Sequence, residues 1–112
     1  MSSNLPDRAA LNRYSNAAFN VLQVDMLGEM ASSLAHHGEL VAAAMNALRA
    51  FDAAPGAADE RVALVRKAAR EVWAFFVQRE ICGFRDQKDV IKQYAIPGEV
   101  LARLGAIEPD QR

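Results

Sequence analysis

Two adjacent histidines, His36 and His37, lie in the most regular apolar stretch of the sequence and are the first candidates for chemistry. Steps of four, three, four and three residues place a polar stripe along one side of an expected helix, formed by Asp25, Glu29, Ser32, His36 and Glu39. Imidazole and carboxylate groups are metal ligands, which makes His36 and Glu39 a candidate metal site. The alternative, a hydrated polar face, is favoured because the chain holds no histidine on any facing segment.

The two histidines cannot both bind one ion, because adjacent residues differ by about 100° around a helix. Each is therefore considered separately. His37 falls on the apolar side of the expected helix. We interpret it as a buried imidazole that forms a hydrogen bond to Ser33, to another helix or to a water. No carboxylate lies one helical turn beyond His37 to orient it for nucleophilic catalysis.

A second dense group of side chains lies in "WAFFVQREICGFRD", where charges crowd the end of an aromatic run. One interpretation is a structural network in which Arg79 or Arg85 pairs with Glu80 or Asp86. The other is a site for a small anion or a peptide carboxylate beside an apolar wall. Its residues would be Trp73, Phe76, Arg79, Glu80 and Arg85.

The elements that position these residues are expected to be helices only, because 22 of the 112 residues are alanine and no segment alternates apolar with polar residues as a strand does. One long helix is expected over residues 15–52, and a turn at Pro55 and Gly56 leads to an antiparallel helix from Asp59, its N-cap, to Cys82. Gly83 is a natural C-terminal stop for that helix.

Two short helices are expected to complete the fold, one beginning at Asp86 and one beginning at Pro97. Residues 15–105 then form a single helical domain, with residues 1–14 as a flexible N-terminal segment and residues 106–112 as a C-terminal tail.

The first helix carries an apolar stripe longer than the second helix can cover. A second copy of the chain could cover the remainder by completing a helical bundle, so we predict a homodimer. The interface residues predicted from the stripe are Met26, Met30, Leu34, His37, Val41 and Met45.

Composition restricts the other partners. The net charge is −1, with 13 basic and 14 acidic residues, which gives no general reason to expect nucleic acid or an anionic membrane surface. No apolar run reaches the length that spans a bilayer, and the single cysteine excludes an intrachain disulfide, so we expect a protein of a bacterial cytoplasm. A helix-turn-helix outline over residues 86–105 keeps a weak DNA-binding regulator as an alternative, although Arg103 is the only cation on its second helix.

The segments "FFVQREICGFRD" and "YAIPGEVLARLG", together with the long first helix, resemble a family of small, uncharacterised, all-helical proteobacterial proteins defined only as a domain of unknown function. The resemblance covers roughly residues 16–105 and implies no activity, substrate or cofactor. From the residues alone we expect a non-enzymatic interaction or regulatory module that acts through self-association and a further protein partner and needs no cofactor. The alternative from another class is a helical bundle that binds a small ligand or a metal.

Overall fold

The computed structural model describes residues 7–105, which form four helices and no strand. These helices are α1 (Arg8–Ala53), α2 (Ala58–Ile81), α3 (Lys88–Gln93) and α4 (Gly98–Leu101). The prediction of an all-α fold with a long helix pair and two short helices is confirmed for the described residues. The chain divides within α1 into two compact units, Met1–Ser32 and Ser33–Arg112, and each is described by itself.

Helix α1 begins at Arg8, earlier than the expected start at Ser15. The reason is a local cap: the backbone N–H of Ala10 donates to Oδ1 of Asp7 at 2.6 Å, which satisfies one of the free donors of the first turn. Residues 8–14, expected to be a flexible segment, are therefore helical. Residues 1–6 and the predicted tail, 106–112, lie outside the described residues.

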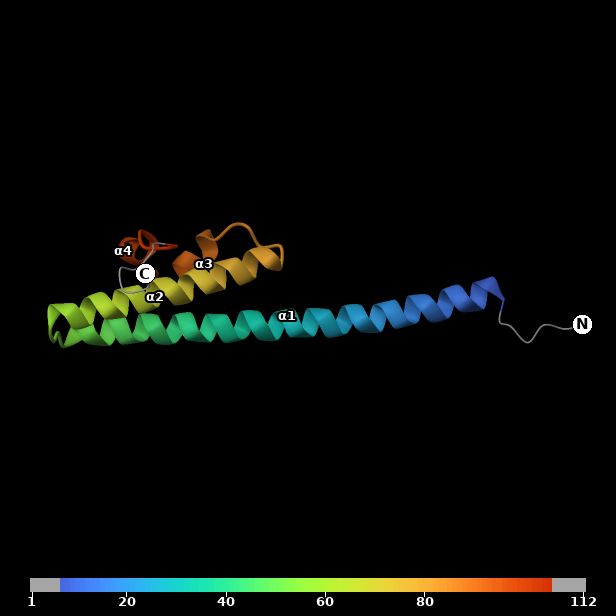
Figure 1. The fold of residues 1–112 in the computed structure, drawn as a ribbon, viewed down its shortest axis with the longest axis horizontal. Coiled ribbons are helices and arrows are strands. Elements are labelled where there is room, and N and C mark those ends of the chain that lie inside the picture. The colour runs from blue at the N-terminus through green and yellow to red at the C-terminus, as the bar shows by residue number, and fades with distance from the viewer. Residues whose placement is uncertain (1–6, 106–112) are drawn as a thin grey trace, which may run out of the picture. The chain divides into compact units, whose positions relative to one another are not determined.

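In the second unit, the part of α1 from Ser33 to Ala53 lies beside α2, and the chain reverses direction at the short connection between them (Figure 1). Their apolar faces make one core, because valine, leucine, methionine and phenylalanine recur at helical spacing on both. The buried residues of this core are Val41, Ala44, Met45, Leu48, Val65, Ala68, Ala69, Val72, Phe75, Phe76, Val90, Ile96 and Val100. The predicted antiparallel packing is therefore present where α1 and α2 share this core.

Helix α2 starts differently from the expectation. Its N-cap is Ala57, whose side chain cannot accept a hydrogen bond, and Asp59 instead accepts from the N–H of Glu60 within the first turn (3.0 Å). The predicted C-terminal stop at Gly83 is confirmed. That glycine adopts a φ of +95°, and the N–H of Phe84 reaches back to the carbonyl of Arg79 at 2.8 Å.

Helices α3 and α4 each contribute one buried side chain to this core, Val90 and Val100. Asp86, the expected cap of α3, accepts a hydrogen bond from the N–H of Lys88 at 3.0 Å, although Gln87 occupies the N-cap position. Pro97 occupies the N-cap of α4 rather than its first turn, and the helix is only four residues long.

Helix α1 continues without a break through "HHG", and the packing of Tyr94 explains the glycine there. Gly38 is buried, and a Cβ atom added there would lie 2.6 Å from the hydroxyl oxygen of Tyr94. The ring of Tyr94 is held edge-on against Phe75, with their centroids 5.7 Å apart. Glycine thus opens a space on α1 that the Tyr94 side chain fills.

Candidate functional site

The largest group of exposed apolar side chains lies on the first part of α1, residues 8–32, where no described residue is buried. Eight large apolar side chains there are between 53% and 78% exposed: Leu11, Tyr14, Phe19, Val21, Leu22, Val24, Met26 and Leu27. Large exposed apolar side chains concentrated on one segment in this way are typical of an interaction site. We call residues 8–32 the open segment.

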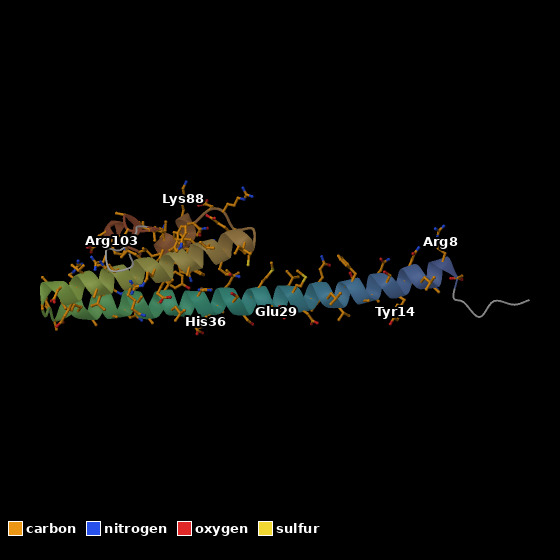
Figure 2. The ribbon with its side chains drawn as sticks, viewed as in Figure 1. Arg8, Tyr14, Glu29, His36, Lys88 and Arg103 are labelled. Carbon is orange, nitrogen blue, oxygen red and sulfur yellow. The ribbon has the colours of Figure 1, made fainter. Side chains whose placement is uncertain are left out.

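Four charged residues accompany this apolar surface. Arg8 and Arg13 lie in the first turns of the open segment, and Asp25 and Glu29 lie near its other end; Figure 2 labels Arg8 and Glu29. The segment is therefore neutral overall but carries its two signs at opposite ends. Near the acidic end a shallow depression is lined by five residues of the one helix: Val24, Asp25, Gly28, Glu29 and Ser32.

The six residues predicted for an interface occupy three environments. Met26 is exposed, whereas Met30, Leu34 and His37 are half-buried. Val41 and Met45 are 0% and 1% exposed and belong to the core with α2. These last two side chains have no surface to offer a second copy.

The two histidines do not form part of a set of metal ligands among the described residues. The His36 and His37 rings lie 5.8 Å apart at an angle of 61°, as neighbours along a helix do. Both His36 and Glu39 are exposed, and within residues 7–105 no three side chains of the types that bind metals lie close enough to hold an ion. Nδ1 of His37 is shielded from solvent and has no hydrogen-bond partner, so the predicted bond to Ser33 is not formed by that nitrogen.

The residues around the end of α2 form a structural network rather than a shared cavity. Nε of Arg79 donates to Oε1 of Gln87 at 2.7 Å, and Nη2 donates to the carbonyl oxygen of Asp86 at 3.3 Å. The guanidinium also lies over the rings of Phe84 (5.1 Å) and Phe75 (5.8 Å). The expected network is present in its location and in its use of Arg79, but the acceptors are an amide and a carbonyl instead of carboxylates.

The remaining members of the predicted ligand site lie apart from one another. Phe76 is buried in the core, while Trp73 is half-exposed. Glu80 and Arg85 line an open depression of about 360 Å³ that includes neither ring. The apolar wall and the polar groups required for ligand binding are thus not brought together.

Sequence reasoning missed a three-residue network of ion pairs centred on Arg61. Its guanidinium contacts Asp52 through Nε (2.8 Å) and Nη2 (3.2 Å), and Glu99 through Nη2 (2.7 Å) and Nη1 (2.9 Å). The hydrogen bonds from Arg61 lower the pKa of both carboxyl groups, and those to Glu99 and Asp52 raise the pKa of the guanidinium. Because 52, 61 and 99 are brought together only by the fold, no spacing in the sequence could indicate the network.

This network also bears on the helix-turn-helix outline. Glu99, in the expected reading helix, is held by Arg61, and α4 exposes Arg103 just beyond its end. A helix of four residues with one neighbouring exposed cation is much less than the set of cationic contacts that DNA binding uses.

Comparisons with known proteins give a family and no activity. Within the described residues, no helix has the length and apolar character needed to cross a membrane. Searches of curated proteins and of solved structures each found no match. The model of a family of unknown function (DUF6665) matches residues 7–112, and the chain therefore belongs to that family. The matched range includes the whole open segment.

Proposed function

Since membership of DUF6665 assigns no activity, we propose that this protein is a self-association module in which the open segment of α1 packs against the open segment of a second copy. The observation that carries the proposal is the exposure of eight large apolar side chains on residues 8–32. The module acts by binding and performs no catalysis.

The distribution of exposed apolar groups supports the choice of this segment. Residues 33–105 expose only four large apolar side chains, although they are nearly three times as many residues, and the open segment exposes eight. A helix with apolar residues over much of its circumference is normally covered by other elements. Burying a leucine, methionine or phenylalanine contributes about 1.5–3 kcal/mol, so covering several of them would drive association.

Two features support a second copy as the occupant. The open segment has two cations and two anions, so no net charge opposes its approach to an identical segment. Its acidic depression is lined by one helix alone and has no opposing wall in the first unit. A second helix of matching length would supply that wall and cover apolar side chains on both copies at once.

The test is the oligomeric state of two matched variants by size-exclusion chromatography with light scattering. Leu22→Glu places a charge on a side chain that is 62% exposed in the open segment. Ile81→Glu makes the same change of character at a side chain that is 66% exposed at the end of α2. We expect wild type and Ile81→Glu to be dimers and Leu22→Glu to be a monomer.

Both variants should retain the wild-type helical circular dichroism, because neither position belongs to the core. A monomeric wild type at micromolar concentrations would contradict the proposal. So would a Leu22→Glu variant that dimerises as tightly as wild type does.

A further inference from the structure

Resting on the proposed function, we infer that the two open segments pair antiparallel, so that the basic end of each lies against the acidic end of the other. The depression formed by Val24, Asp25, Gly28, Glu29 and Ser32 borders this contact at Glu29, where the first turn of the second copy brings Arg8. The partner of this surface is thus a second copy in one defined orientation.

Charge placement decides the orientation. In a parallel pair through the same helix face, Arg8 would lie beside Arg8 of the other copy, and Glu29 would lie beside Glu29. An antiparallel pair sets Arg8 of each copy near Glu29 of the other, whereas Arg13, five residues after Arg8, lies on the far side of the helix. The helix dipole favours the same choice, because the partly positive N-terminus of each α1, at Arg8, lies beside the Glu29 carboxylate of the other copy.

The seam, by which we mean the stripe of α1 that contacts the second copy, is symmetric in position as well as in charge. Steps of three and four residues place one stripe along the open segment. Its members are Arg8, Leu11, Ser15, Ala18, Leu22, Met26 and Glu29.

Reversing this stripe about a point between Ala18 and Phe19 brings Arg8 opposite Glu29 and Leu11 opposite Met26. The small side chain of Ala18 at the centre lets the two helices approach closely, and the ring of Phe19 flanks the contact on each copy. The stripe is therefore complementary to its own reverse, which is what a twofold axis requires.

Cross-linking of single cysteines tests the orientation. In a Cys82→Ser background, Leu11→Cys and Met26→Cys are prepared separately and as an equimolar mixture, then treated with a short bismaleimide. In the antiparallel pair, position 11 of one copy lies beside position 26 of the other. Equal positions lie 15 residues apart along the axis, about 22 Å, which is beyond the reach of the reagent. We expect a covalent dimer from the mixture and almost none from either variant alone.

Each outcome separates the inference from the function on which it rests. Efficient cross-linking of each variant alone would show a parallel pair, which overturns this inference while leaving self-association intact. A wild-type protein that is monomeric would remove both.

A second set of variants tests the orientation without touching the apolar seam. Reversing one end, by Arg8→Glu, creates a new like-charge repulsion only in the antiparallel pair, because a parallel pair sets like charges together before and after the change, so we expect dimerisation to weaken on the order of tenfold. Also reversing the other end, by Glu29→Arg, should restore it. Loss of helix cannot mimic the first result, because glutamate in the first turns stabilises a helix. Dimerisation unchanged by reversal of one end would contradict the antiparallel pairing.

Discussion

Replacement of Gly38 by alanine should give no gain in stability, although glycine inside a helix is normally the weaker residue. Alanine is favoured over glycine in a helix interior by about 1 kcal/mol. At Gly38, however, the new Cβ would lie 2.6 Å from the hydroxyl oxygen of Tyr94, closer than carbon and oxygen can approach without displacement. The half-buried Tyr94 ring is packed edge-on against Phe75, so it cannot move freely away.

The magnitude follows from these two effects. Overpacking a closely filled site costs about 1–3 kcal/mol, which cancels or exceeds the gain in helix propensity. Tyr94→Phe removes the clashing oxygen and leaves the nearest remaining atom, the Cζ carbon of residue 94, at 3.7 Å, an ordinary contact distance. In that background the same Gly38→Ala change should stabilise the protein by about 1 kcal/mol. The two substitutions should therefore be coupled by about 1–3 kcal/mol.

The assay is a double-mutant cycle of thermal and urea unfolding on wild type, Gly38→Ala, Tyr94→Phe and the double variant. For a domain of this size, 1 kcal/mol corresponds to about 4–8 °C in the melting temperature. Gly98→Ala at the first residue of α4 is the matched control, because a Cβ there meets no atom within 4 Å, and it should not lower the melting temperature. If Gly38→Ala stabilised both backgrounds equally, the contact between α1 and Tyr94 would not have the role assigned to it.

Three further predictions concern the charged networks of the second unit. Arg61→Met removes the contacts to both Asp52 and Glu99 and should lower the melting temperature relative to wild type. This loss should become smaller at high salt, and the same loss at all salt concentrations would argue against an electrostatic role. Folding lowers the pKa of the Asp52 and Glu99 carboxyls, so their contribution to stability is present above the unfolded pKa and is lost as the pH falls below about 4. The difference in melting temperature between wild type and Arg61→Met should therefore shrink over that range. A difference that stays constant from neutral pH to below about 3 would contradict the role of these ion pairs. Arg79→Met should destabilise the fold, because Arg79 has two hydrogen bonds and two ring contacts. The matched Arg85→Met should leave the free energy of unfolding within about 0.5 kcal/mol of wild type. Equal effects of the two substitutions would contradict the structural role of Arg79.

Helical periodicity was sufficient to predict the elements, because the apolar positions of α1 and α2 repeat at three and four residues and Gly83 stops α2 where a left-handed residue is needed. It was not sufficient to predict the start of α1, since a run of mixed polarity before Ser15 hides a helix that the Asp7 side chain caps. The stripe also did not separate residues buried within one chain, such as Val41, from those left exposed, such as Met26. That division depends on which residues of α1 share the core with α2, and only the folded chain determines it.

Contacts between distant parts of the sequence were the other omission. The ion pairs of Arg61 join three helices, and the contact of Gly38 joins α1 to the residue after α3. Neither leaves a local pattern. The exposed part of the expected helix after Ser15, in contrast, was indicated by a stripe longer than its partner helix, although residues 8–14 of the open segment were not.

Native mass spectrometry of the freshly purified wild-type protein tests the central claim most directly. We expect a species of twice the chain mass of 12.2 kDa, which dissociates on dilution and carries no additional ligand. A spectrum containing only the single chain at micromolar concentrations would contradict the proposed self-association through the open segment.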